Sequence, residues 1–234
     1  MTRTDDRSLP EGPEKVRAVR TMFDTIAPRY DLVNRVMTFG LDARWRRRTV
    51  EALALPAGSL VADLACGTGD LCRELAAAGH RPFGADLSAG MLSEARTDAP
   101  LVLADVLQLP VRDGSLDGVT SGFALRNVAS LQALLDEIAR VVRPGGRIAL
   151  LEVAEPRHAL ARWGHRVWFG TVVPRLGGLL SDREAYAYLP RSVAYLPAPE
   201  DLLAMIRRAG FEDVARQPLT AGAAQLLVAT RDQR

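Results

Sequence analysis

Cysteine and histidine are scarce in this sequence, and the few present are not grouped as metal ligands. The chain has two cysteines, Cys66 and Cys72, and three histidines. No C-x-x-C pair and no cysteine–histidine cluster occurs, so no zinc site or other metal site is predicted. Two thiols within one short stretch are typical of a reduced cytoplasmic protein rather than of a disulfide framework.

Long hydrophobic runs and a large excess of one charge are also missing. No stretch of 18 uncharged apolar residues occurs, so no membrane-spanning helix is predicted. Residues 1–10 are polar and predict no signal peptide. The formal net charge of +2 is too small to favour nucleic acid as a partner. We therefore expect a cytoplasmic protein that binds no nucleic acid.

The length and composition predict one globular domain. The chain has 234 residues, of which 48% are hydrophobic, enough for one core. Residues 1–13 are expected to be disordered and residues 14–234 to form the domain. Within it, residues 14–55 are predicted to form helices, and residues 154–198 break the pattern around them and are interpreted as a lid-like insertion.

Between these two regions, segments with strand and helix patterns alternate. Such alternation is typical of an α/β fold with a mostly parallel sheet and helices on both faces. Helices are predicted over 70–78, shortly after Ser88, over 130–142 and over 200–209, the third stopped by the glycines at 145 and 146. Strands are predicted over 59–65, 81–86, 101–104, 116–121, 148–153, 211–216 and 225–230.

The first predicted strand runs into a glycine loop, Gly67-Thr68-Gly69, followed by a helix. Bare backbone at such a turn lets main-chain N–H groups approach a nucleoside-sized ligand. The loop lacks the third glycine of the dinucleotide fingerprint and the lysine of a P-loop. Asp63 precedes it and Asp70 follows it, so the flanking charges favour a cation over a pyrophosphate.

Acidic residues recur where the predicted strands end: Asp63, Asp86 and Asp105. The carboxyl ends of parallel strands meet at one edge of the sheet, where ligands bind. Asp86 is well placed to accept hydrogen bonds from ribose hydroxyls, and Asp105 from an adenine amine. The alternative for any one of them is that aspartate simply favours turns after strands.

Several longer motifs carry a resemblance to a known family. The string Asp63 to Asp70 resembles the first motif of class I S-adenosylmethionine-dependent methyltransferases. Three further stretches resemble signatures of the ubiquinone/menaquinone-biosynthesis C-methyltransferases of UbiE/MenG type: Tyr30-Asp31-x-x-Asn34 with Trp45, residues 123–128 and residues 140–147. The resemblance covers residues 14–220.

This resemblance implies a Rossmann-like three-layer sandwich around a mostly parallel seven-stranded sheet with an antiparallel C-terminal strand. It implies S-adenosylmethionine as the cofactor. Carried over residue by residue, the catalytic positions are Tyr30, Arg126 and Asn127, with Arg126 stabilising a phenolate; the alternative for Arg126 is a structural ion pair. The cofactor-binding residues are Asp63, Gly67, Thr68, Gly69, Asp86, Leu87, Ala104, Asp105 and Gly122.

The implied reaction is methyl transfer to a ring carbon of a polyprenylated hydroquinone such as demethylmenaquinol. Asp42 stands where the family usually has histidine, and a C-terminal family histidine is missing. Two alternatives therefore stay open: methylation of a small phenol or polyketide, and a non-catalytic cofactor-binding partner protein. A lipophilic quinol would bring the chain to the inner face of the membrane, and the apolar, arginine-flanked residues 163–180 are expected to make this peripheral contact. Whether the chain forms a homodimer is left open.

Three arginines in a row, Arg46, Arg47 and Arg48, follow Trp45. Such a run can contact nucleic acid or anionic lipid. We prefer the alternative that all three lie on a solvent-exposed helix face.

Overall fold

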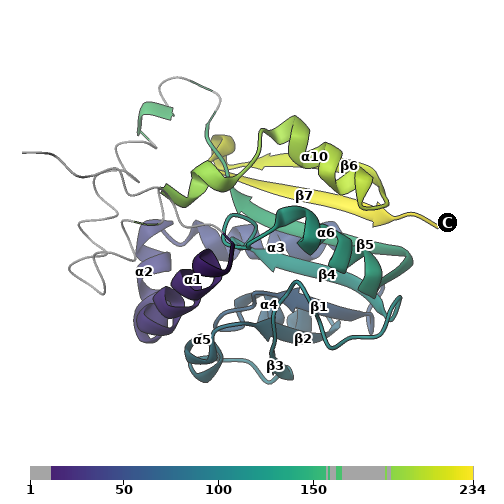
Figure 1. Ribbon diagram of the computed structural model, residues 1–234, viewed down its shortest axis with the longest axis horizontal. Helices are drawn as coiled ribbons and strands as arrows, with labels where there is room; N and C mark the ends of the chain where they lie inside the picture. The colour runs from purple at the N-terminus through teal and green to yellow at the C-terminus, as the bar shows by residue number, and fades with distance from the viewer. Residues whose placement is uncertain (1–11, 157, 159–161, 165–187, 189–190, 234) are drawn as a thin grey trace, which may run out of the picture.

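A seven-stranded sheet runs through the computed structural model, which describes residues 12–156, 158, 162–164, 188 and 191–233 (Figure 1). The strand order is β3-β2-β1-β4-β5-β7-β6. Strands β1 to β5 pair in parallel, and β7 is antiparallel to both of its neighbours. This confirms the predicted sheet. The strands are β1 (Leu60–Leu64), β2 (Arg81–Asp86), β3 (Leu101–Leu103), β4 (Leu116–Gly122), β5 (Val142–Val153), β6 (Phe211–Leu219) and β7 (Ala224–Arg231).

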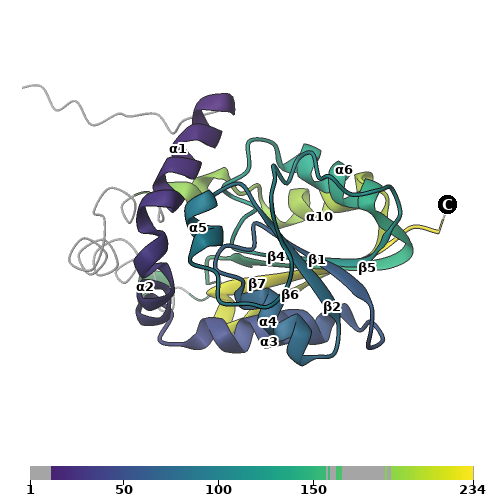
Figure 2. The ribbon, with the colours of Figure 1, turned by 90° about the horizontal axis from the view of Figure 1, so that it is seen from below.

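Helices cover both faces of the sheet and complete the three layers. Helices α3 (Leu41–Leu53) and α4 (Asp70–Ala77) lie on one face, and α6 (Leu131–Val141) and α10 (Pro199–Arg208) on the other (Figure 2). Alternate residues of β1 feed the two cores: Val61 packs with the α3 and α4 side, and Ala62 and Leu64 with the α6 and α10 side. Burial on both faces explains why the parallel strands read as apolar runs.

The N-terminal helices lie at the end of the sheet opposite the C-terminus (Figures 1 and 2). They are α1 (Gly12–Ile26), the short 3-10 turn Ala27–Arg29 and α2 (Tyr30–Met37). Asp24 of α1 accepts hydrogen bonds from the Ser88 hydroxyl at 2.6 Å and the Gly90 amide at 2.9 Å, at the start of α5 (Ala89–Ser93). The Thr68 hydroxyl donates to the carboxylate of Asp31 at 2.6 Å. The helices are thereby joined to the glycine loop.

Strand β5 begins earlier than the sequence predicted. Helix α6 ends at Val141, and β5 starts at Val142 rather than at Ile148. The reason is a non-local pairing: Leu116 of β4 lies opposite Val142, and the register shifts before Gly118 meets Arg147. Gly145 and Gly146, which the sequence pattern predicts to end a helix, therefore lie within an irregular first part of the strand.

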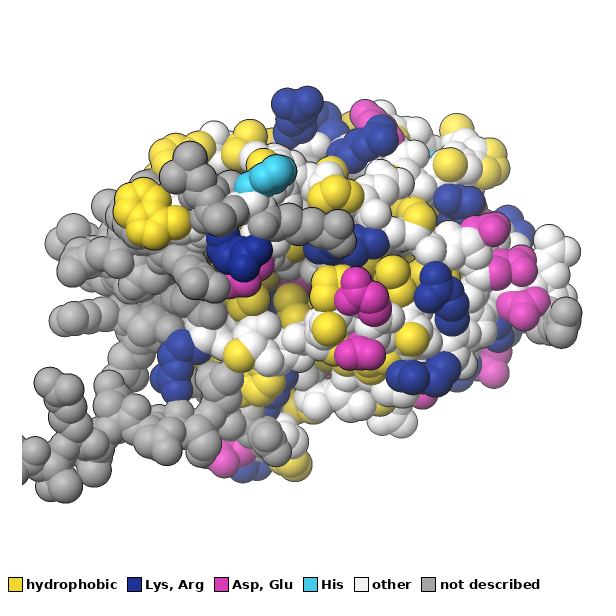
Figure 3. Space-filling model, turned by 90° about the horizontal axis from the view of Figure 1, so that it is seen from above, with side chains coloured by type: hydrophobic (Ala, Val, Ile, Leu, Met, Phe, Trp, Pro, Cys, Tyr) yellow, Lys and Arg dark blue, Asp and Glu magenta, His cyan; other side chains and the backbone are white. Residues whose placement is uncertain are grey.

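Most of the predicted insertion, and almost all of residues 163–180, lie outside the described residues. The described parts include Trp163, whose side chain is exposed, and the 3-10 turn Val193–Tyr195. Among the helices described, none is long and apolar enough to cross a membrane. The face shown in Figure 3 carries basic and acidic side chains interspersed with apolar ones.

Candidate active site

The main cavity opens where the carboxyl ends of β1, β2 and β4 meet helix α1. Its empty space amounts to about 1030 Å³ counted out to the mouth, a size that suits a cofactor together with a small ring. Nine of the twelve predicted site residues line it, whereas Gly69, Ala104 and Arg126 do not. The nine are Tyr30, Asp63, Gly67, Thr68, Asp86, Leu87, Asp105, Gly122 and Asn127.

The loop between β1 and α4 presents backbone to this cavity. Gly67 and Gly69 both have positive φ, 55° and 82°, a conformation that glycine adopts without strain. A Cβ placed on Gly67 would come within 2.9 Å of the Met91 methyl group. Two non-glycine residues at the cavity, Ala65 and Phe123, also have positive φ, 53° and 60°, and such strain is common at functional sites.

Asp86 ends β2 and holds the loop in place. Its carboxylate accepts a hydrogen bond from the Gly67 amide at 2.8 Å and another from the Ser88 amide at 2.8 Å. Burial raises the pKa of this carboxyl, and the backbone donors oppose the shift. Asp105 lies beyond the end of β3 on the same rim and is exposed. Acceptors therefore follow one another along the sheet edge, as predicted.

Asp63 is a nearly fully buried carboxyl at the cavity wall. It is 1% exposed and accepts hydrogen bonds from the Thr120 hydroxyl at 3.0 Å and the Cys72 thiol at 3.8 Å. Burial raises its pKa to about 7, although Thr120 and Arg46 act in the opposite direction. A cation in the cavity would favour the ionised form of Asp63.

The raised pKa of Asp63 has a consequence for stability. Between pH 4 and pH 7 the folded protein keeps a proton that the unfolded chain, with the ordinary pKa of 3.8, has lost. The free energy of unfolding contributed by Asp63 therefore falls as pH rises through this window and levels off above it. We expect the free energy of unfolding of Asp63→Asn, relative to that of wild type, to rise by about 2–3 kcal/mol from pH 5 to pH 8, measured by urea unfolding without ligands. Parallel pH profiles for the two proteins would contradict this.

Asp70, the other predicted flanking acid, also lines the cavity but is paired. Its carboxylate forms ion pairs with Arg46, at 2.8 Å, and with Arg73. Arg46 is itself buried on α3 and also pairs with Asp42. The sequence interpretation of a wholly exposed arginine run is thus wrong for Arg46, and the charge of Asp70 is balanced.

Of the three predicted catalytic residues, Tyr30 and Asn127 line the cavity and Arg126 does not. Tyr30 begins α2, and burial raises the pKa of its phenol. The Asn127 amide donates to the Phe123 carbonyl at 3.2 Å and accepts from the Tyr188 hydroxyl at 3.5 Å. Arg126 is buried and does not reach the cavity surface.

The Arg126 guanidinium forms an ion pair with Glu152 of β5 and donates to the Ser192 hydroxyl at 3.1 Å. Glu152 is completely buried. This is the structural alternative considered for Arg126. Burial raises the pKa of both Tyr30 and Tyr188, and the positive charge of Arg126 opposes the rise. Arg126 is thus part of a buried ion pair next to Asn127, which lines the cavity.

Sequence reasoning missed an apolar wall of the cavity. Helix α1 contributes Val16, Val19 and Phe23, and Val128 follows β4. For the residues of α1, the signal in the sequence was apolar side chains at three- and four-residue steps. That pattern predicts a helix face packed in the core as well as one that lines a cavity. Only the fold shows that the stripe faces the cavity.

Comparisons with known proteins agree with this geometry. A model of the ubiE/COQ5 methyltransferase family matches residues 12–231. A demethylmenaquinone methyltransferase of Thermus thermophilus is 45% identical over 220 residues, which are 90% of this chain and 100% of that protein. The ubiquinone/menaquinone biosynthesis C-methyltransferase UbiE of Syntrophotalea carbinolica is 41% identical over 212 residues, 87% of this chain and 90% of that protein.

Among solved structures, a SAM-dependent methyltransferase from Thermotoga maritima superposes with a TM-score of 0.65 at 17% identity. The match covers 92% of this chain and 100% of that chain, and at this identity it supports the fold alone. The family model and the relatives show family membership as well as the fold, because they match nearly the whole sequence. The chain belongs to the ubiE/COQ5 methyltransferase family.

Proposed function

We propose that this chain transfers a methyl group from S-adenosylmethionine to a ring carbon of a lipophilic hydroquinone such as demethylmenaquinol. The observation that carries the proposal is one cavity with two kinds of wall. The carboxylates at the strand ends suit a cationic nucleoside, and the apolar side chains of α1 suit a ring with a prenyl tail. Membership of the family supports the same reaction.

The residues of the loop and strand ends fit the cofactor. Asp86 and Asp105 supply acceptors for the ribose hydroxyls and the adenine amine, and Gly67 leaves room for backbone contact. Asp63 supplies the negative charge that a sulfonium and an ammonium group favour. When bound, S-adenosylmethionine supplies an electrophilic methyl group on a positively charged sulfur. The proposed contacts also include Thr68, Leu87 and Gly122, which line the cavity, whereas Gly69 and Ala104 do not line it and are proposed only to shape the two loops beside it.

The acceptor ring is proposed to lie between Tyr30, Asn127 and the apolar wall. A phenolic oxygen that loses its proton pushes electrons onto the neighbouring ring carbon, which forms the bond to the methyl group. The sulfur of a bound S-adenosylmethionine would keep the electron pair of the broken carbon–sulfur bond; the ring carbon would then lose its hydrogen as a proton, and the ring oxygen would regain one, so that one proton is released overall. Tyr30 stays protonated because its pKa is raised, so it can donate to the ring oxygen, and a water held by Asn127 can take the phenolic proton.

We expect purified protein with methyl-labelled S-adenosylmethionine to label a demethylated naphthoquinol but not the matching quinone. The quinone carbonyls withdraw electrons, so its ring carbon is a poor nucleophile. The measurement is counting of organic-phase radioactivity, with a buffer blank. Labelling of a simple phenol in preference to the quinol would favour the small-phenol alternative. Binding of the cofactor without transfer to any acceptor would favour the non-catalytic partner protein.

A prenylated acceptor resides in the membrane, and each buried methylene of its tail is worth about 0.8 kcal/mol. We therefore propose that the enzyme is cytoplasmic and meets its substrate at the inner membrane face by peripheral contact. Flotation with liposomes of anionic phospholipid tests this, and recovery of all the protein in the lipid-free fraction would contradict it.

A further inference from the structure

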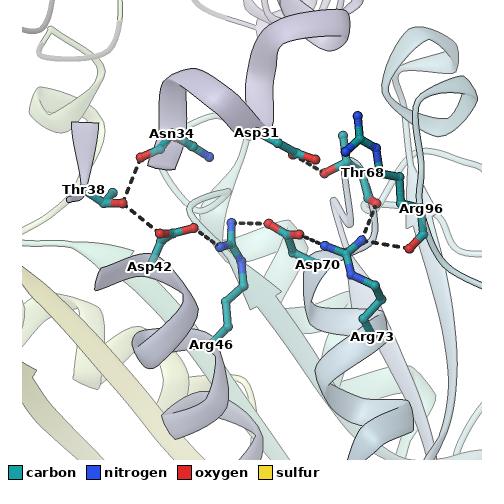
Figure 4. A network of polar contacts seen from close by, with 9 residues as sticks. All are labelled: Asp31, Asn34, Thr38, Asp42, Arg46, Thr68, Asp70, Arg73 and Arg96. Carbon is teal, nitrogen blue, oxygen red and sulfur yellow. Dashed lines mark hydrogen bonds and ion pairs between the residues drawn. The ribbon is translucent and has the colours of Figure 1, made fainter. Parts of the chain in front are cut away.

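Arg46 is a buried cation held between two carboxylates. On α3 its guanidinium donates to Asp42, one helical turn earlier, and on its other side to Asp70, at the start of α4, at 2.8 Å. Figure 4 shows the guanidinium bridging these two side chains. Arg46 as a whole is 8% exposed. A buried charge of this kind is costly unless its partners and surroundings compensate it.

The guanidinium also faces the ligand cavity. Arg46 lines the main cavity together with Tyr30, Asp63 and Thr68, and its charge opposes the rise that burial causes in the pKa of Tyr30 and Asp63. A guanidinium has five N–H donors, and the bonds to Asp42 and Asp70 use two of them. Donors are thus left for an anionic group in the cavity.

The surrounding charges allow an anion to enter. Asp42 and Asp70 are balanced by Arg46 and by Arg73, which pairs with the second oxygen of Asp70. The four side chains together carry no net charge, and Asp63, which lines the same cavity, suits the ammonium group that accompanies the carboxylate. Asp42, which does not line the cavity, and Asp70, which does, hold the guanidinium in place, and this reduces the entropy lost when it binds a ligand.

The order of the strands indicates which end of the cofactor lies there. Strands β3, β2 and β1 lie side by side in this order in the sheet. Asp105 follows β3 and Asp86 ends β2, and their carboxylates are the acceptors proposed above for adenosine. The amino-acid end is then left over β1, beside Asp63. The α-carboxylate at that end is the anionic group of S-adenosylmethionine.

We propose that Arg46 binds the α-carboxylate of S-adenosylmethionine and that Asp42 is a positioning residue for its guanidinium. The contact is a charge-assisted hydrogen bond in a site with little water, which is the strong kind. The proposal rests on the cofactor and on the cofactor orientation proposed above, and it does not depend on which acceptor is methylated.

The test compares S-adenosylmethionine with its decarboxylated analogue, which lacks only the carboxylate, by calorimetry without any acceptor. Wild type is expected to bind the complete cofactor about tenfold or more tightly than the analogue. In Arg46→Gln the two affinities should agree within about twofold, because the variant lacks the partner of the missing group. Arg46→Lys should keep part of the preference. Arg47→Gln, the exposed neighbour on the same helix, is the matched control and should keep all of it.

Equal weakening of both ligands in Arg46→Gln would overturn the proposal, since it would mean that Arg46 acts only on the structure of the loop. Normal binding of both ligands with a raised KM for the acceptor would also overturn it and would place Arg46 at the acceptor. If Arg46→Gln does not fold, the ratio for Arg46→Lys decides, and an undiminished wild-type ratio there counts against a guanidinium contact. Failure of wild type to bind S-adenosylmethionine at all would instead contradict the cofactor assignment.

Discussion

Asp86→Ala should weaken the binding of S-adenosylmethionine by about 1.5–3 kcal/mol, the usual worth of a hydrogen bond to a charged group. The carboxylate lies at the end of β2 on the cavity wall, and we propose that it accepts from the ribose hydroxyls. It also accepts from the amides of Gly67 and Ser88, both at 2.8 Å. Its removal therefore takes away a ligand contact and also loosens the glycine loop before the ligand arrives.

Calorimetric titration of wild type and variants measures this effect. Asp86→Asn keeps one oxygen acceptor in the same shape and should lose less affinity than the alanine variant. Asp98→Ala is the matched control, because Asp98 is exposed and does not line the cavity. Unchanged affinity in Asp86→Ala, with thermal unfolding showing a folded protein, would remove Asp86 from the cofactor site.

Arg126→Met should destabilise the protein by about 3–5 kcal/mol, the usual cost of removing one partner of a buried ion pair. Glu152 is completely buried, and without Arg126 its charge would keep, among the described residues, hydrogen bonds from main-chain amides only. Urea unfolding measures the loss. The double variant Arg126→Met/Glu152→Gln has no unpaired charge and should recover most of the stability.

Turnover of the same double variant separates the two roles of Arg126. We expect it to stay at least about 100-fold below wild type, the scale found when a group that stabilises a developing oxyanion is removed. Arg126 is followed in the chain by Asn127, which lines the cavity, and its charge opposes the rise that burial causes in the pKa of Tyr30 and Tyr188, so we expect that charge to be felt at the proposed acceptor end. Turnover that returns together with stability would make Arg126 a structural clamp and nothing more. The control is the double variant Arg143→Met/Asp117→Asn. It removes an ion pair near the starts of β4 and β5, at the sheet edge away from the cavity.

Local patterns in the sequence were sufficient for most of the architecture. The strand, glycine loop and helix around Gly67 follow from apolar runs and from the backbone freedom of glycine. Asp63, Asp86 and Asp105 were placed on one rim because the carboxyl ends of parallel strands meet there. Helix α6 could be predicted from its Ser130 cap and its apolar period. Each of these inferences needs only residues that are close in the chain.

Arg46 shows what the sequence by itself left undecided. Beside Arg47 and Arg48 it has the pattern of an exposed face, yet it is buried because Asp70, from another helix, packs against it. The raised pKa of Asp63 likewise depends on burial by elements far away in the chain. The sequence determined which groups reach the rim of the sheet. The tertiary structure decided which of them are paired and which face the cavity, because burial and electrostatic pairing depend on distances in space and not on spacing along the chain.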